Sequence, residues 1–171
     1  DDEILWKGKP DRDESEEPSV FSIFSRAEFA VIKHHYEWRT FSRGEKIIVQ
    51  GTEPEHLFYI TEGAGGVWIK GVEVAEVGKL QWLGEMSFFT HEKASATIVV
   101  KSETMKMIQF DMHYLRHQLH NHGHSIETSA FSKLPSLFCK QIVHRTQELS
   151  DEIIRKKSEV RRDYTKRKLN Q

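Results

Sequence analysis

The sequence of 171 residues has a single cysteine and lacks any long apolar run. Its apolar stretches, such as Ile47 to Val49, hold only a few residues, whereas a transmembrane helix needs about 20. Cys139 has no partner for an internal disulfide, which favours a reducing compartment. No signal-peptide pattern opens the chain. We therefore predict an intracellular protein with no transmembrane segment in this chain, in an organelle that the sequence does not specify.

The motifs that mark common active sites are also missing. The sequence contains no Gly-x-Ser-x-Gly, no P-loop and no Cys-x-x-Cys. The glycines of residues 63–66 lack the following helix of a phosphate loop, and Cys139 is typical of a small buried side chain on an amphipathic helix. Five histidines cluster without a supporting carboxylate or cysteine, which indicates an exposed helix end rather than a zinc or copper site: His113, His117, His120, His122 and His124. We predict a non-enzyme with no catalytic or metal site.

Charge is unevenly distributed, although the net charge is only −1. Residues 1–20 hold eight acidic and three basic side chains, and residues 151–171 hold four acidic and eight basic ones. We predict an extended acidic arm over residues 1–24 and a basic helical tail over residues 151–171, which projects or frays beyond Arg155. The basic end is typical of a solvated helix; a nucleic acid, a lipid surface or an acidic partner are its alternatives.

The pattern between the two ends predicts helices around a β-rich centre. Ser25 and Glu28 form a capping box that opens a helix to about Glu37. Short strands separated by glycine turns indicate a sandwich or barrel with no long internal repeat, at residues 39–41, 46–49, 57–61, 67–70, 72–77, 95–101 and 105–110. Asp111 is expected to cap a following helix, and Pro135 to lie in the first turn of another. The predicted domain spans residues 25–150.

Two segments carry a family resemblance. Residues 41–51 (FSRGEKIIVQG) and 57–63 (LFYITEG) form the first, and residues 83–98 (LGEMSFFTHEKASATI) form the second. They resemble the opening strands and the phosphate-binding cassette of the cyclic-nucleotide-binding superfamily, which includes the catabolite activator and the regulatory subunit of protein kinase A. The altered cassette also has a loose likeness to Popeye-type domains. The resemblance implies a mainly β fold with flanking helices, namely an antiparallel, jelly-roll-like β-roll.

The resemblance also implies which residues would hold a ligand. Gly84 and Glu85 match the family's glycine and ribose-binding carboxylate, and Met86, Ser87 and their neighbours to Phe89 match its short helix. Ser95 and Ala96 match the end of the cassette, where Ser95 would donate to the phosphate. Ala94 stands where the family has an arginine. Losing that charge-assisted pair should cost on the order of 2–5 kcal/mol.

Two functions follow from this altered cassette. The favoured one is a structural or interaction subunit of a larger assembly, which binds other protein subunits through its N-terminal arm and its C-terminal helix. The alternative is a sensor that binds a cyclic nucleotide or a related small anion and signals through its C-terminal helices. No cofactor is expected, and cAMP or cGMP should bind only weakly. Too few residues follow Ser150 for a DNA-binding helix-turn-helix domain.

Overall fold

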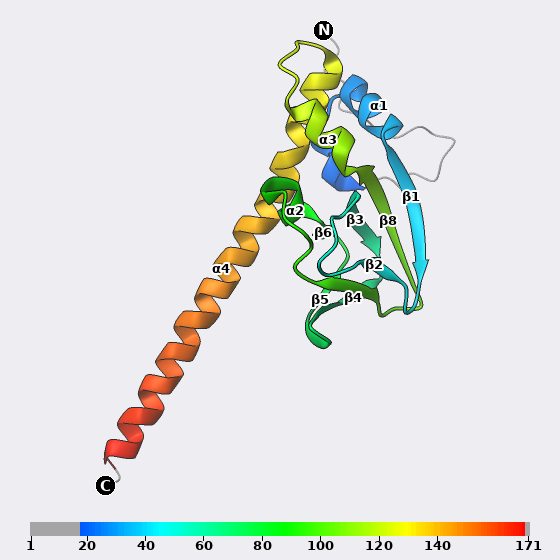
Figure 1. Ribbon diagram of the computed structural model, residues 1–171. Coiled ribbons are helices and arrows are strands. Elements are labelled where there is room, and N and C mark those ends of the chain that lie inside the picture. Colours follow the sequence, from blue (N-terminus) through cyan, green and yellow to red (C-terminus); the bar gives the residue numbers. More distant parts are fainter. Residues whose placement is uncertain (1–17, 170–171) are drawn as a thin grey trace. The chain divides into compact units, whose positions relative to one another are not determined.

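Two four-stranded antiparallel sheets form the centre of the fold, which the computed structural model describes for residues 18–169. One sheet has the order β1-β8-β3-β6, with β1 (Tyr36–Ser42), β8 (Thr104–Asp111), β3 (His56–Glu62) and β6 (Trp82–Leu83). The other has the order β2-β7-β4-β5, with β2 (Lys46–Ile48), β7 (Thr97–Val100), β4 (Ala64–Ile69) and β5 (Val72–Gly78). The sheets form a roll with helices gathered at one end (Figure 1). This architecture confirms the predicted antiparallel β-roll.

The first sheet is covered on both of its faces, because side chains alternate along its strands. On β3, Phe58 and Ile60 point between the sheets, whereas Leu57 and Tyr59 point toward the helices. The cluster between the sheets is apolar and buried; we call it the roll core, and it consists of Ile48, Phe58, Ile60, Val77, Leu83, Ala94, Ile98, Val100, Met105 and Met107.

Three helical segments cover the other face. The 3-10 helix η2 (Ser19–Ile23) buries Phe21, α1 (Arg26–His34) buries Phe29 and Ile32, and α3 (Met112–Leu119) buries Leu115. The capping box at Ser25 has both of its hydrogen bonds, and the Asp111 side chain accepts from the amide of Tyr114, so both predicted caps are confirmed.

The fold starts earlier than the predicted domain boundary. Phe21 and Phe24 are almost fully buried, with ring centroids 6.0 Å apart, in a region that we assigned to an extended arm. Aromatic burial therefore orders η2 against the helices. The acidic segment of residues 1–17, to which most of that prediction applies, lies outside the described residues.

A single helix, α4 (Ile126–Leu169), ends the described chain. Our placement of Pro135 in a first helical turn is wrong, because this proline lies inside α4. Buried side chains on either side of it, including Phe131 and Phe138, keep the helix continuous despite the missing amide donor. Beyond Arg155, where we predicted a helix that projects or frays, α4 continues to Leu169, so the fraying alternative is wrong.

The chain divides within α4 into two compact units, one ending at Phe138 and one starting at Cys139. The described part of the second unit is helical throughout. Over the described residues 18–169, no helix is long and apolar enough to cross a membrane.

Candidate functional site

The turn before the helix α2 (Glu85–Thr90) is the centre of the candidate site. Gly84 has φ of 89°, and a Cβ at this position would lie 3.1 Å from the carbonyl oxygen of His56. Its own carbonyl accepts from the amide of Phe88 at 3.0 Å and starts the helix. A left-handed conformation next to another backbone requires glycine here.

The predicted site residues differ in exposure. Glu85 and Ser87 on α2 are buried, with 4% and 6% of their surface exposed, whereas Met86 points outward and is 52% exposed. Ser95 is exposed on the bend that precedes β7, and Ala96 beside it is half-buried. The cassette therefore has a buried carboxylate at one end and an exposed hydroxyl at the other.

Ala94 lies in the roll core. Its side chain is 8% exposed and belongs to the same apolar cluster as Ile48 and Ile98. Its backbone is fixed on both sides, because its amide donates to the carbonyl of Thr52 and its carbonyl accepts from the amide of Gly51, each at 2.8 Å. The position that would carry the arginine therefore contributes a methyl group to a dry cluster.

Within residues 18–169, no buried cation lies near the cassette to replace that arginine. Among the described residues, the buried polar or charged side chains are Glu28, Glu85, Ser87 and Gln109, so none is basic. Lys93 and His91, the neighbours that might have substituted, are both exposed. An anionic phosphate at this cassette would therefore meet no buried lysine or arginine among the described residues.

The tryptophans Trp68 and Trp82 lie outside the roll core. Trp82 is 2% exposed and belongs to the cluster under the helices, where its ring centroid lies 4.8 Å from Tyr59 and 5.5 Å from Phe138. The indole nitrogen of Trp68 lies 2.9 Å from the position of a Cβ on Gly66, next to the carboxylate of Glu73. The roll core is therefore packed by aliphatic, methionine and phenylalanine side chains.

Arg116 on α3 joins the cassette helix to the helices that follow the roll. Its Nε donates to the carbonyl of Phe88 at 3.3 Å, and its Nη2 donates to the carbonyl of Ser87. A guanidinium suits the end of α2, where carbonyls lack intrahelical partners and the helix dipole is negative. We did not predict this contact, because one basic residue among several on α3 has no pattern that reveals a partner 28 positions away.

A second polar cluster lies where α1, α3 and α4 meet. The hydroxyl of Tyr114 donates to Glu127, and the ring of Tyr114 stacks on His35 with centroids 4.5 Å apart. The Nε2 of His35 lies 3.6 Å from the carboxylate of Glu127. Burial and the neighbouring Glu127 raise the pKa of Tyr114 to about 12, so this phenol stays protonated and its hydroxyl serves as a donor that joins the helices.

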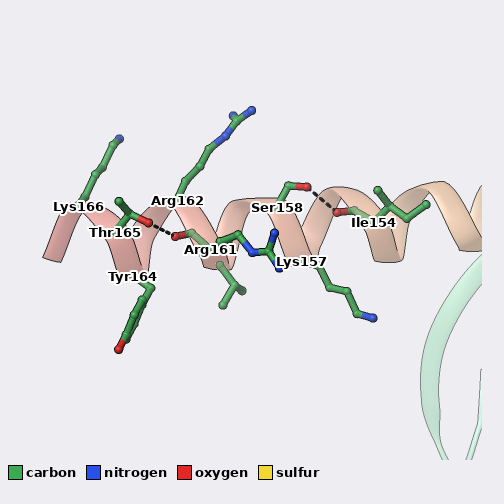
Figure 2. Close-up of a pocket in the computed structure, with 9 residues that line it drawn as sticks. Ile154, Lys157, Ser158, Arg161, Arg162, Tyr164, Thr165 and Lys166 are labelled. Atoms are coloured by element: carbon green, nitrogen blue, oxygen red, sulfur yellow. Dashed lines mark hydrogen bonds between the residues drawn. The ribbon is translucent and has the colours of Figure 1, made fainter. Parts of the chain in front are cut away.

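Two other candidates lack the features of a site. The clustered histidines from His113 to His124 are exposed, and residues 18–169 contain no group of three or more histidine, cysteine or acidic side chains that could hold a metal. Figure 2 shows a hollow lined by nine residues, all of them on α4 between Ile154 and Lys166. A single helix forms its wall, so it could not shield a small ligand from water.

A family model matches the centre of the chain. Residues 38–122 match the model of the cyclic nucleotide-binding domain. This segment contains every strand from β2 to β8, most of β1, the cassette and α3.

Two curated proteins are similar over part of the chain. The cAMP-dependent protein kinase type II regulatory subunit of Drosophila melanogaster is 28% identical over 78 residues, which cover 43% of this chain and 21% of that protein. The cGMP-dependent protein kinase of Plasmodium berghei is 30% identical over 86 residues, which cover 50% of this chain and 10% of that protein. The similarity thus spans about a fifth of the length of the first relative and a tenth of the length of the second.

Solved structures with the same fold include two bacterial proteins. A cyclic nucleotide-binding domain from Methylobacillus flagellatus has a TM-score of 0.65 at 22% identity, covering 78% of this chain and 74% of that chain. A putative cyclic nucleotide-binding protein from Geobacter metallireducens has a TM-score of 0.62 at 14% identity, and the match covers 75% of this chain and 92% of that chain. The regulatory subunit of a cAMP-independent protein kinase A from Trypanosoma cruzi, bound to guanosine, has a TM-score of 0.51 at 19% identity. This match covers 57% of this chain and 35% of that chain.

Proposed function

Because residues 38–122 form a domain of the cyclic nucleotide-binding family, we propose that this chain is a non-catalytic, divergent member that no longer holds a cyclic phosphate. In this proposal the roll is a scaffold, and the chain works as an interaction subunit of a protein assembly. The name of one relative, a kinase regulatory subunit, supports a role that depends on binding other proteins.

The burial of Ala94 in the roll core is the observation that carries the proposal. A charge-assisted, bidentate pair to phosphate is worth on the order of 2–5 kcal/mol, so its loss weakens binding roughly 30- to several-thousand-fold. The described residues offer no buried lysine or arginine in its place.

Calorimetric titration of the full chain with cAMP and cGMP tests the proposal. We expect dissociation constants above about 10 μM for both nucleotides. An Ala94→Arg variant that circular dichroism shows to be folded should bind both nucleotides more tightly than the wild type, because the guanidinium restores the missing pair. The matched control is Gln147→Arg, which adds the same charge at an exposed position on α4, outside the cassette, and should have little effect. Submicromolar binding by the wild type would refute the proposal.

A second function, sensing of a small ligand, is favoured by a different observation. Gly84 and the buried Glu85 keep the cassette turn, and Arg116 joins α2 to α3, so a ligand that moved α2 would also move α3. A cassette without a cation suits an uncharged nucleoside better than a cyclic phosphate. The Trypanosoma cruzi structure, titled as cAMP-independent and bound to guanosine, supports this choice of ligand. Micromolar binding of guanosine, with cAMP and cGMP remaining weak, would favour the sensor.

A further inference from the structure

An 11-residue repeat runs along α4 from Phe138 onward, and it becomes visible because α4 is one uninterrupted helix. Successive repeats start at residues 138, 149 and 160. The first position of each repeat is apolar, namely Phe138, Leu149 and Val160. The fifth is apolar or aromatic, namely Ile142, Ile153 and Tyr164. The eighth is basic, namely Arg145, Lys156 and Arg167. Three helical turns of about 3.67 residues make one repeat, so positions 11 apart lie on the same side of the helix.

The first and fifth positions of the repeat form an apolar stripe along the helix, and the basic eighth position borders it. Phe138 is buried in the first unit, but Leu149, Ile153 and Val160 are 61%, 54% and 70% exposed. Figure 2 shows that Tyr164 points to the opposite side of the helix from Arg162 and Lys166, which are polar and lie outside the stripe. A helix with one apolar stripe and a polar opposite side is built to pack against a partner along that stripe.

The charges that flank the stripe identify the partner. The fourth position of the repeat is Gln141, Glu152 or Asp163 and lies on one side of the stripe; the ninth is Thr146, Lys157 or Lys168 and lies on the other side. When two copies pack in parallel, the acidic side of one helix meets the basic side of the other, with Glu152 opposite Lys157 and Asp163 opposite Lys168. An antiparallel pair would instead place like charges together.

The basic residue at the eighth position is compatible with this pairing. The Nζ of Lys156 lies 2.9 Å from the carboxylate of Glu152 in the same helix, so its charge is balanced before a partner arrives. Its methylene stem can cover apolar surface while the amine stays in water. Polar groups in such a seam lower the stability of the pair but favour one register and one number of strands.

We propose that residues 139–169 form a parallel, two-stranded coiled coil with a second copy of this chain. The 11-residue period gives this pair a right-handed supercoil. The proposal goes beyond the function proposed above and does not depend on what the roll binds. Nucleotide titration and the measurement of chain association therefore fail or succeed independently.

Disulfide cross-linking tests both the pairing and its direction. In a Cys139→Ser background, Leu149→Cys and Val160→Cys are each introduced into the full chain and oxidised. The two sites are 11 residues apart, or about 16.5 Å along the helix. A parallel, in-register pair brings each cysteine next to its own copy, so both variants should cross-link. An antiparallel pair can bring only one such site to its own copy.

The matched control is Ile154→Cys in the same background. Ile154 is 63% exposed, so its access to oxidant equals that of the stripe, but it follows Ile153 by one residue and faces away from the seam. It should cross-link at least about tenfold more slowly, because its side chain points away from its own copy and the two Cα atoms lie beyond the roughly 7 Å that a disulfide can span. Equal rates for Ile154→Cys and the two stripe variants would overturn the proposal.

Charge reversal tests the pairing without cysteine. Sedimentation equilibrium of the wild type should give twice the monomer mass of 20.0 kDa. Lys157→Glu with Lys168→Glu should raise the dissociation constant at least about tenfold, because four attractive contacts become repulsive. Adding Glu152→Lys and Asp163→Lys should restore dimers. Arg162→Glu with Lys166→Glu changes the net charge equally on the opposite side and should leave dimerisation nearly unchanged.

Two further outcomes would contradict the proposal. One is a wild-type chain that sediments as a monomer at about 100 μM, well above a micromolar dissociation constant. The other is a monomer that binds vesicles of phosphatidylserine but gives no cross-link at Leu149 or Val160, since the stripe would then face a lipid surface. Circular dichroism of each variant confirms that its helix content is unchanged.

Discussion

Replacing Glu28 by glutamine should lower the free energy of unfolding by about 2–3 kcal/mol at neutral pH, and by much less in acid. This carboxylate is 5% exposed and joins α1 to α4. One oxygen accepts from the hydroxyl of Ser129 at 2.7 Å, and the other accepts from the amine of Lys133 at 2.7 Å and the amide of Ser25 at 2.8 Å. A neutral amide cannot satisfy all three donors.

The magnitude follows from the pKa of Glu28. Burial alone would raise it, but hydrogen bonds from Lys133, Ser25 and Ser129 outweigh burial and lower it from 4.5 to about 2. A difference of this size corresponds to about 3 kcal/mol, which we reduce slightly because Lys133 is 40% exposed and partly screened by solvent. Since the folded-state pKa is lowered, this stability is present above pH 4.5 and is lost as the pH falls through 2.

Urea unfolding of the wild type and Glu28→Gln at pH 7 and pH 3 measures the effect. The difference between the two proteins should fall by about half or more at pH 3, where the ionised carboxylate has lost much of its advantage. Glu53→Gln removes a charge from an exposed position and should change stability by less than about 0.5 kcal/mol at either pH. A loss at Glu28 that is independent of pH, or no larger than that of the control, would refute this reasoning.

Gly84→Ala should destabilise the fold by about 1–3 kcal/mol, because it combines a left-handed conformation with a Cβ 3.1 Å from the carbonyl oxygen of His56. Gly71→Ala, which has φ of 78° but open space around it, should cost less in the same thermal melts; an equal cost would contradict the role of the close approach. Pro135→Ala should stabilise α4 by up to about 3 kcal/mol, since it restores a donor to the carbonyl of Phe131. Thermal unfolding measures this gain, and a lower melting temperature would show that the proline is needed for packing.

Local signals in the sequence were sufficient for most of the fold. Glycine turns separate short β-rich stretches, so seven of the eight strands in residues 18–169 were predicted, although β1 starts earlier than expected. The capping box at Ser25 and the cap at Asp111 use side chains within three residues of their partners, and such contacts are readable from sequence. The strand β6 was missed because Trp82 and Leu83 are too few to form a pattern.

Features that depend on distant contacts could not be predicted. A proline normally ends or starts a helix, but Pro135 is tolerated because Phe131 and Phe138 are buried on either side of it. The period of 11 residues was overlooked for the same reason, since it requires a helix that continues through the proline and past Arg155. The contact between Arg116 and α2 depends on how α3 packs against the roll.

The candidate site was only partly readable. The sequence shows an alanine at position 94, and the family resemblance indicates that an arginine normally occupies this position and binds the phosphate. Whether another cation takes its place depends on which basic side chains are buried, and this required the structure. Lys93 and His91 are adjacent in sequence, yet both are exposed, so neither supplies a buried charge.

The dissociation constant of cAMP for the wild-type chain tests the central claim most directly. If the roll is a scaffold whose cassette cannot balance a phosphate charge, titration at physiological salt should give a value above about 10 μM, or no measurable heat. An excess of cGMP should not change the heat measured when cAMP is added. A submicromolar constant, abolished by Glu85→Ala, would show that the cassette still binds a cyclic nucleotide and would contradict the account.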